Sequence, residues 1–351
     1  MKPATLPERF LKNLALLCPD YKQSIFLVAF SGGLDSTALV HLMGKTVKAE
    51  NLILAHLNHQ LRGSEAERDQ RFCHSTAESL GLRLIIETRA VRELAARRRK
   101  GLEDAARKAR YDFLASAAEA VRARYILTAH QADDQAETML MSLIKGAGAG
   151  GLAGIHPRRT LIPEKGEMDA PPLLLRPLLP FSRAELKVWL LNQGHQWVED
   201  STNADTHYLR NALRADILPR LTALNPRLLQ AVSRGSTILR DEEDFWKEHL
   251  TDLWASAIAE EKNGLISFKV SFLLNISKAE QRRLIYEGLL KLWRARPHRN
   301  EPLTFEGVEM ALELLAGKRC SGLDLPGGLR AGLSKGLLEL TQASRFLKGK
   351  N

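Results

Sequence analysis

Residues Ile25–Ser36 read IFLVAFSGGLDS, a short apolar run followed at once by a glycine-rich polar turn. The run Ile25–Phe30 predicts a buried β-strand, and the helical spacing of Thr37–Val47 predicts that a helix follows the turn. Two adjacent glycines let the backbone approach a ligand closely and adopt conformations that other residues resist. Because exposed N–H groups lie at the start of a helix, the stretch predicts an anion site between strand and helix.

Three more strand candidates follow, with helical segments between them: Leu52–His56, Leu82–Glu87 and Tyr125–Ala129. Strands that alternate with helices predict an α/β fold with a doubly wound, mostly parallel sheet, and such a sheet binds ligands at the carboxyl ends of its strands. The composition changes near Leu224, so we expect a catalytic nucleotide-binding domain over residues 1–221. Residues 222–351 are expected to form a mainly helical accessory domain with a small C-terminal hairpin at Pro326-Gly327-Gly328.

The composition is that of an ordinary globular protein. The 351 residues are 44% hydrophobic and 26% charged, and no apolar stretch is long enough to predict a membrane helix. The net charge of +10 is typical of a protein with a polyanionic partner. Three scattered cysteines form no CxxC pair, which fits a reducing cytoplasm.

Hydroxyl and carboxyl groups accompany the glycines of the turn. Ser31, Ser36 and Thr37 are potential donors to an anion, whereas Asp35 would repel a phosphate unless Mg²⁺ lay between them. An ordinary strand-to-helix corner is the alternative, but the whole string SGGLDS in this context favours the anion site. Two other nucleotide motifs fit poorly. Gly44-Lys45-Thr46 resembles the end of a Walker A loop, but Leu39 stands where that loop needs its first glycine. The glycines at Gly146–Gly151 match the GxGxxG dinucleotide motif, but they follow a helical segment instead of a strand.

Polar residues also follow two other predicted strands. The second strand runs into HLNHQLRG, where backbone groups near Leu57 are placed to contact adenine; His59 is as easily structural, and zinc lacks further ligands here. The fourth strand runs into AHQADDQAET, which brings His130 together with Asp133, Asp134 and Glu137. Acids at a helix start suit the helix dipole, but that alternative does not account for the histidine and three acids beside one cleft.

Arginines recur at helical spacing in two further segments. Arg107 and Arg110 share a helical face with Glu103 and Tyr111, and Arg210 and Arg214 lie one turn apart. Guanidinium groups bind a polyphosphate or an RNA phosphate well, although a solvated face or a capped basic helix explains the same pattern. The run from Arg97 to Lys100 is interpreted as an RNA-contacting loop. Taken alone, the same run of charges would indicate only a solubilising segment.

The string SGGLDS resembles the PP-loop, SGGxDS, of the ATP pyrophosphatase superfamily. Together with HLNHQLRG, GLEDAARKARY, AHQADDQAET, KGAGAGGLAGI and EDSTNADTHYLRNALR, it resembles the tRNA(Ile)-lysidine synthase family over roughly Phe26–Leu221. The segment LDLPGGLRAGLSKGLLEL resembles an accessory domain of that family more weakly. Lys145 stands where many members have arginine, which keeps the charge but loses the planar fork.

The resemblance implies an ATP-dependent ligase. It would adenylate O2 of the wobble cytidine of a CAU-anticodon tRNA(Ile), and the ε-amine of free L-lysine would then attack C2 and expel AMP. The lysidine so formed reads AUA instead of AUG. ATP and Mg²⁺ are the implied cofactors, the cytoplasm is the implied location, no membrane is involved, and a homodimer occurs in the family.

The implied site residues follow from the matched motifs. Nucleotide binding falls to Ser31, Gly32, Gly33, Leu34, Asp35, Ser36 and Leu57, with Mg²⁺ on Asp35. Asp35, Arg107, His130 and Asp133 are the expected catalytic residues, with Arg107 neutralising the leaving pyrophosphate and His130 orienting an acid. Asp133, Asp134 and Glu137 are expected to bind lysine, and which acid serves lysine and which a metal stays open. Arg97, Arg110, Arg210 and Arg214 are the expected tRNA contacts.

Three rival functions share part of this evidence. A PP-loop enzyme that thiolates tRNA shares the adenylation step, but its cytidine-thiolating relatives use CxxC cysteines that this chain lacks. A non-catalytic RNA-binding module would have no use for Asp35 or for the acids of Asp133–Glu137. A synthetase acting on a small metabolite fits the basic charge and the large second half less well than a tRNA enzyme does.

Overall fold

The computed structural model describes residues 4–60, 63–98, 101–161, 170–199, 209–262, 264–296, 303–317 and 322–343, without the side chains of Arg97 and Arg98. The chain forms two compact units, Met1–Arg240 and Asp241–Asn351, divided within helix α11 (Leu228–Ala257). The predicted domain boundary at residue 221 lies upstream of this division. The assignment of 1–221 and 222–351 as functional domains stays a prediction.

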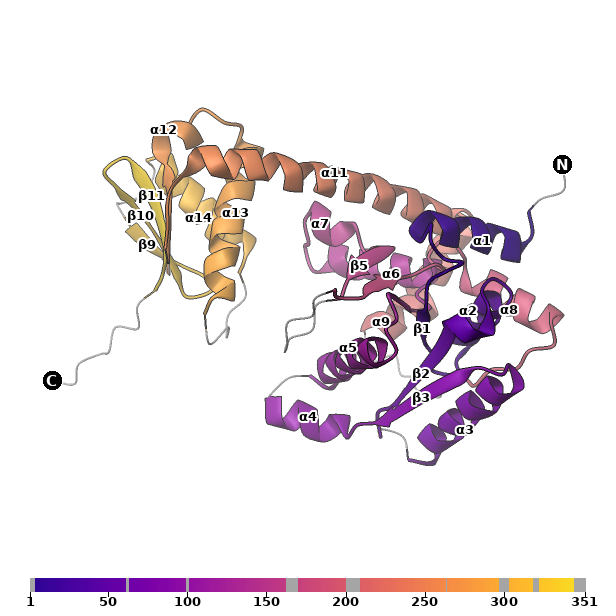
Figure 1. Ribbon diagram of the computed structural model, residues 1–351. Coiled ribbons are helices and arrows are strands. Elements are labelled where there is room, and N and C mark those ends of the chain that lie inside the picture. The colour runs from indigo at the N-terminus through magenta and orange to yellow at the C-terminus, as the bar shows by residue number, and fades with distance from the viewer. Residues whose placement is uncertain are drawn as a thin grey trace. The chain divides into compact units, whose positions relative to one another are not determined.

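The first unit is built on a six-stranded sheet in the order β3-β2-β1-β4-β6-β5 (Figure 1). Its strands are β1 (Phe26–Ala29), β2 (Leu52–Asn58), β3 (Arg83–Thr88), β4 (Tyr125–Leu127), β5 (Arg158–Thr160) and β6 (Leu173–Leu175). All neighbouring strands run parallel except β5, which is antiparallel to β6. The predicted α/β fold with a mostly parallel sheet is therefore confirmed.

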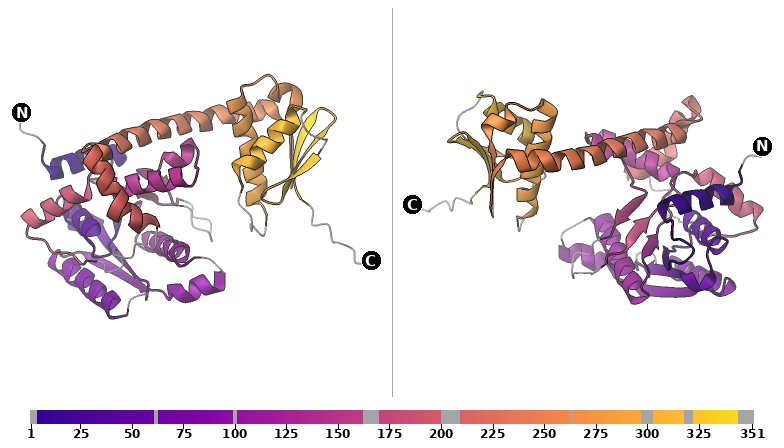
Figure 2. Two further views of the ribbon diagram at one scale, coloured as in Figure 1. Left: turned by 180° about the vertical axis from the view of Figure 1, so that it is seen from behind. Right: turned by 45° about the horizontal axis from the view of Figure 1, so that its top comes forward.

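Helices cover both faces of this sheet (Figure 2). One core packs Phe26 and Val28 of β1 against α1 (Leu6–Leu17), α2 (Leu34–Gly44), α3 (Ser64–Ser79) and α8 (Arg183–Asn192). The opposite core packs Leu27 against α5 (Leu102–Ala120). Side chains of β1 thus alternate between two dry interiors, which is why the strand is apolar throughout.

The remaining segments of the first unit are short helices and turns. They are η1 (Ala49–Asn51), α4 (Val91–Arg98), α6 (Ala132–Ile144), α7 (Ala149–Leu152), α9 (Leu209–Ala212), the π-helical turn η3 (Leu213–Ile217) and α10 (Leu218–Leu224). The last three follow one another without a break from Leu209 to Leu224. A π-turn within a helix is frequently a feature of functional sites.

The second unit contains a five-stranded antiparallel sheet in the order β7-β8-β11-β10-β9. Its elements are β7 (Ile258–Lys262), β8 (Leu265–Lys269), α12 (Val270–Leu273), α13 (Lys278–Arg294), α14 (Phe305–Leu315), β9 (Gly322–Leu325), β10 (Leu329–Ser334) and β11 (Leu337–Gln342). The predicted hairpin is present as β9–β10, and Gly327 at its turn has φ +83°. The sheet is larger than that hairpin, because β7, which follows α11 directly, pairs with β8, and β8 pairs with β11.

Among the residues that the structure describes, each helix is either too short or too polar to cross a bilayer.

Candidate active site

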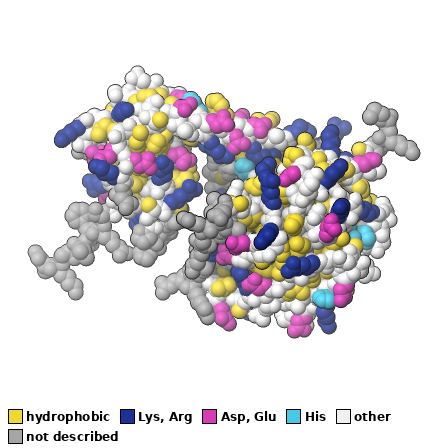
Figure 3. Space-filling view, viewed as in Figure 1, with side chains coloured by type: hydrophobic (Ala, Val, Ile, Leu, Met, Phe, Trp, Pro, Cys, Tyr) yellow, Lys and Arg dark blue, Asp and Glu magenta, His cyan; other side chains and the backbone are white. Residues whose placement is uncertain are grey.

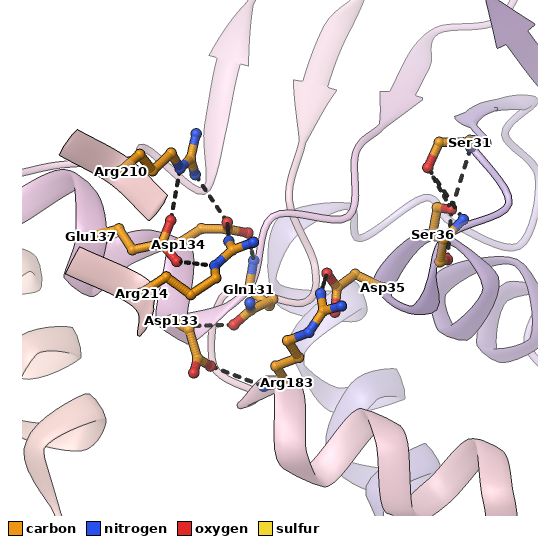
Figure 4. A network of polar contacts seen from close by, with 11 residues as sticks. Ser31, Asp35, Ser36, Gln131, Asp133, Asp134, Glu137, Arg183, Arg210 and Arg214 are labelled. Carbon is orange, nitrogen blue, oxygen red and sulfur yellow. Dashed lines mark hydrogen bonds and ion pairs between the residues drawn. The ribbon is translucent and has the colours of Figure 1, made fainter. Parts of the chain in front are cut away.

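The turn between β1 and α2 is held open by its own hydrogen bonds. Ser36 Oγ donates to Gly33 O at 3.0 Å and accepts from Ser31 N at 3.3 Å (Figure 4). Gly32 has φ +82°, and an added Cβ would lie 3.1 Å from a ring carbon of Phe72. The backbone therefore takes a path at Gly32 that side chains disfavour and that leaves no room for one.

The start of α2 has no side-chain cap. Gly33 is the N-cap residue and has no side chain to accept a hydrogen bond from the first turn. The free N–H groups and the positive end of the helix dipole consequently form an anion site at this end of the sheet. The loop Ser31–Ser36 fits a phosphate, as its sequence predicts.

Asp35 lies in the first turn of α2 and is largely buried. Its Oδ2 lies 2.5 Å from Arg183 Nη1, and its Oδ1 is buried without a hydrogen-bond partner. Burial raises the pKa of Asp35 to about 6, while Arg183 acts in the opposite direction. An unpartnered carboxylate oxygen beside a phosphate site fits Mg²⁺, which takes one or two carboxylates plus phosphate oxygens.

A metal site made of protein side chains alone would need several His, Cys, Asp or Glu residues close together. Across the described stretches of the chain, no three His, Cys, Asp or Glu side chains gather closely enough to hold a metal by themselves. Asp35 would therefore share its Mg²⁺ with a bound nucleotide.

Helix α6 begins at the end of β4 with a reciprocal cap. Gln131 Oε1 accepts from Asp133 N at 2.6 Å, and Asp134 Oδ2 accepts from Gln131 N at 3.0 Å. This cap fixes the backbone of the first turn of α6, and with it the positions from which the side chains of Asp133, Asp134 and Glu137 extend. Burial raises the pKa of Asp133.

Two arginines clamp two of these acids. Arg210 Nε and Arg214 Nε lie 2.7 Å and 2.6 Å from the two carboxylate oxygens of Glu137 (Figure 4). The same two guanidinium groups reach Asp134 Oδ1 at 3.0 Å and 3.3 Å. Glu137 is completely buried, and such a charge is tolerated only when it is paired and hydrogen-bonded.

Arg183 connects the acids of α6 with the loop of α2. Its backbone N donates to Asp133 Oδ2 at 2.9 Å, while its guanidinium contacts Asp35. Arg183 is the first residue of α8, which follows a capping box made by Ser182 and Glu185. The beginnings of α2, α6 and α8 thus meet at one end of the sheet.

A cleft of about 240 Å³ opens beside this network. Asp133, Glu137, Arg183 and Arg214 line one side of it, and Leu218, Pro219 and Thr222 of α10 line the other. An aliphatic chain that ends in a cation suits such a lining, with the methylene groups on the apolar wall and the charge at the acids.

Comparison with known proteins identifies the architecture. A family model described as a PP-loop domain matches residues 6–221. The chain belongs to the PP-loop domain family. A tRNA(Ile)-lysidine synthase of Geobacter sulfurreducens is 38% identical over 218 residues, which cover 62% of this chain and 44% of that protein.

A second relative is similar over a longer stretch. A tRNA(Ile)-lysidine synthase of Bacillus licheniformis is 30% identical over 331 residues, covering 93% of this chain and 66% of that protein. The chain thus spans less than two thirds of the length of these relatives. Among solved structures, a U34-tRNA thiolase of Methanococcus maripaludis with its [4Fe-4S] cluster covers 66% of this chain and 78% of its own, at 14% identity and a TM-score of 0.52. That likeness shows the fold alone.

The PP-loop and the acids are gathered as expected from the topology, and three of the residues expected to contact tRNA or to orient an acid have partners within the chain, while their predicted roles stay predictions. Arg210 and Arg214, predicted as tRNA contacts, hold Glu137 and Asp134. His130, predicted to orient an acid, lies with Nδ1 3.0 Å from Thr128 Oγ1 instead. Burial, followed by Arg176 and three further arginines, lowers the pKa of His130 to about 3, so its ring is neutral at pH 7.

The other predicted residues occupy separate places around the PP-loop domain. Leu57 is near the end of β2 and packs half-buried against two hydrophobic clusters, while its backbone contact with adenine stays a prediction. Arg107 and Arg110 lie on α5. Arg97 belongs to α4, and its side chain lies outside the described residues.

Arg183 is the site residue that sequence reasoning missed. The available signal was its position at the first helical residue of a capping box, between Ser182 and Glu185, shortly after the apolar residues of β6. In a parallel sheet, a helix that starts there faces the same edge as the PP-loop.

Proposed function

We propose that this chain is a tRNA(Ile)-lysidine synthase, which joins lysine to C2 of the wobble cytidine of a CAU-anticodon tRNA(Ile) at the expense of ATP. The relatives that carry this name match the chain over the PP-loop and beyond it. The observation that carries the proposal is Arg183, which contacts Asp35 at 2.5 Å and Asp133 at 2.9 Å. The phosphate site and the acids consequently belong to one reaction centre.

The first step is adenylation of the base. Cytidine O2 attacks the α-phosphorus of ATP, and the bond to the β-phosphate oxygen breaks to release pyrophosphate. Ser31, Ser36 and the N–H groups from Gly32 to Leu34 would hold the pyrophosphate. Mg²⁺, when bound to Asp35, supplies charge neutralisation for it. Arg107 lies on α5, which packs on the opposite core of the sheet from α2, so in this proposal the leaving group is held by the PP-loop donors and the Asp35 site.

The second step joins lysine. The ε-amine attacks C2 of the adenylated cytidine, the C2–O2 bond breaks, and AMP leaves with that oxygen. Free lysine arrives as an ammonium ion with a reference pKa near 10.4, so an acid must hold it and a proton must leave before attack.

Asp133 is the best-placed acid for that ammonium group. Glu137 uses both carboxylate oxygens on Arg210 and Arg214, and Asp134 is held by the same pair. Asp133 accepts a hydrogen bond from Arg183 N through Oδ2 and lines the 240 Å³ cleft. We therefore assign lysine binding chiefly to Asp133, with Glu137 and Asp134 supplying negative potential behind it.

The RNA is expected to bind across both halves of the chain. The target base must leave its stack to reach the acids, as in other base-modifying enzymes. Arg97 and Arg110 are proposed contacts to the tRNA, and the second unit is proposed to hold the stem through phosphate charge and shape. We also propose that the protein acts on tRNA in the cytoplasm and that it forms a homodimer.

The test is ATP-dependent transfer of labelled lysine to a tRNA(Ile) transcript with a CAU anticodon. A transcript with C34 changed to U is the control for the target base, and Asp35→Asn is the matched control protein. We expect label only with wild-type protein, ATP and the C34 transcript. Absence of label from a folded protein that binds the transcript would refute the proposal and favour a thiolation or binding role.

A further inference from the structure

Four arginines surround the Tyr111 side chain on the α5 side of the sheet. The guanidinium carbons of Arg107 and Arg159 lie 5.6 Å and 5.3 Å from the centre of the Tyr111 ring. Arg176, just after β6, has Tyr111, Arg159 and Arg107 as electrostatic neighbours. Arg110 has Tyr111 and Arg107 as neighbours in turn. We call this set, Arg107, Arg110, Arg159 and Arg176, the arginine cluster.

The arginine cluster has no matching acids. Within the part of the chain that the structure describes, none of its four guanidinium groups has a carboxylate within the 4.0 Å of an ion pair. Arg176 is only 4% exposed, and its Nε is buried without a hydrogen-bond partner. The other three arginines are exposed, and they add like charges beside this buried cation. A buried cation and adjacent like charges are both unfavourable, so the cluster fits a site that an anion completes.

The face of the first unit shown in Figure 3 does not mark this site by a concentration of charge. On the face shown in Figure 3, the lysine and arginine side chains of the first unit lie scattered among apolar and acidic ones. The net charge of +10 therefore says little about where an anion binds, whereas the unpaired cluster does.

The arginine cluster is separate from the phosphate site of the PP-loop. Helix α5 packs on the core that contains Leu27, and α2 packs on the opposite core, with Phe26 and Val28. The free N–H groups of α2 and the guanidinium groups near α5 thus belong to opposite faces of the same sheet. His130, at the end of β4, is influenced by Arg176, Arg210, Arg110 and Arg107, which places the cluster next to the clamped acids.

We propose that the arginine cluster binds the backbone phosphates that flank the target base. This inference rests on the proposed function, because a ribose-phosphate chain then has to bring a base to the acids while ATP occupies the PP-loop. Guanidinium groups suit phosphodiesters because their planar forks donate two hydrogen bonds at once. Arg107 and Arg159 already lie over the Tyr111 ring, so the site recognises charge rather than base identity and positions the strand without reading it.

Arg159→Ala tests the site, and Arg158→Ala is its matched control. Both arginines are exposed in the short edge strand β5, and successive side chains of a strand point to opposite sides. Neither substitution removes a described ion pair. Circular dichroism and thermal unfolding of both variants, measured first, verify that they are folded.

The readout is binding of the tRNA(Ile) transcript and of ATP, each alone. We expect Arg159→Ala to weaken transcript binding roughly tenfold at 0.1 M salt, the size of one charge-assisted contact. The substitution should also make the negative slope of log K for transcript binding against log salt concentration shallower by about 0.7–0.9, the value for one phosphate contact. Arg158→Ala should match wild type in both, and ATP binding should be unchanged in both variants.

Other outcomes separate this inference from the proposed function. Unchanged transcript binding by Arg159→Ala, or weakened ATP binding with normal RNA binding, would overturn the arginine cluster as an RNA site even if the wild type forms lysidine. Selective loss of RNA binding would support the cluster even if no lysine is transferred, since the binding assay contains neither lysine nor ATP.

Discussion

Arg214→Ala separates two roles for the arginines beside α6. The sequence predicts that Arg214 contacts the tRNA, whereas the structure pairs its Nε with Glu137 at 2.6 Å. If the pairing is its main role, the substitution leaves a completely buried carboxylate with one arginine instead of two. The first effect should then be on stability and on the lysine site rather than on RNA affinity.

The size of the effect follows from burial. Removing one partner of a buried ion pair costs about 3–5 kcal/mol. The Arg214 side chain is 31% exposed and Arg210 remains on Glu137, so solvent and the second arginine reduce the cost to about 2 kcal/mol. For a unit of this size, about 1 kcal/mol corresponds to about 2–4 °C in Tm, so we expect Tm to fall by about 4–8 °C.

The assay is thermal unfolding, with transcript binding measured well below both Tm values. Arg220→Ala is the matched control, because Arg220 lies on neighbouring α10 with its side chain 75% exposed and pairs only with an exposed Asp216. Its loss should change Tm by about 1 °C or less. In a double-mutant cycle with Glu137→Gln, Arg214→Ala should cost much less than it does in the wild type.

Either of two results would refute the reasoning. An unchanged Tm for Arg214→Ala would mean that the buried carboxylate does not depend on this arginine. A salt-dependent loss of transcript affinity at unchanged Tm would restore Arg214 as a direct RNA contact.

Three further predictions test other parts of the first unit. Gly32→Ala should abolish ATP binding in equilibrium dialysis, because Gly32 has φ +82° and the Phe72 ring fills the space that an added Cβ would need. Gly81→Ala is the control, because Gly81 has φ +62° but open space around it, and this variant should bind ATP normally. Acid should destabilise the unit between about pH 6.5 and 4, since burial lowers the pKa of His41, stacked 3.5 Å from His195, to about 4, and the unfolded chain takes up the proton first. Urea unfolding at pH 7 and pH 4.5 measures this loss, and His41→Gln should reduce it. Gln135→Leu should lower the free energy of unfolding by about 1–3 kcal/mol in urea, because Ser236 of α11 and the backbone of Ala153 and Ile155 would lose their hydrogen bonds to Gln135. An unchanged urea midpoint would contradict a stabilising role for these hydrogen bonds.

Much of the fold and of the phosphate site could be predicted, because both rest on local patterns. Apolar runs that alternate with helices specify parallel strands, and parallel strands bring their carboxyl ends to one edge. The string SGGLDS and the acids of Asp133–Glu137 could thus be assigned to one edge of the sheet from the sequence alone. The hairpin turn at Pro326-Gly327-Gly328 was equally local.

The pairing of side chains could not be predicted in this way. Arg210 and Arg214 lie more than seventy residues from Glu137 in the chain, and their contact depends on how α9 and η3 pack against α6. The same arginines on a solvated helix would show the same spacing. β7 was missed because Ile258–Lys262, read as sequence, continues the charged pattern of α11, and only pairing with β8 makes it a strand.

The charge balance of the reaction centre gives the clamped arginines a purpose. Four carboxylates, on Asp35, Asp133, Asp134 and Glu137, meet three guanidinium groups, on Arg183, Arg210 and Arg214. In formal charge, 3 − 4 leaves −1, which the ammonium group of the proposed lysine substrate would balance. Without the clamp, the same acids would attract further cations and would repel the phosphates that must approach them. Arg210 and Arg214 hold Glu137 and Asp134, whereas Arg183 holds Asp35, the residue that would hold Mg²⁺. The clamp on the two inner acids is therefore independent of the contact that a metal at Asp35 would alter.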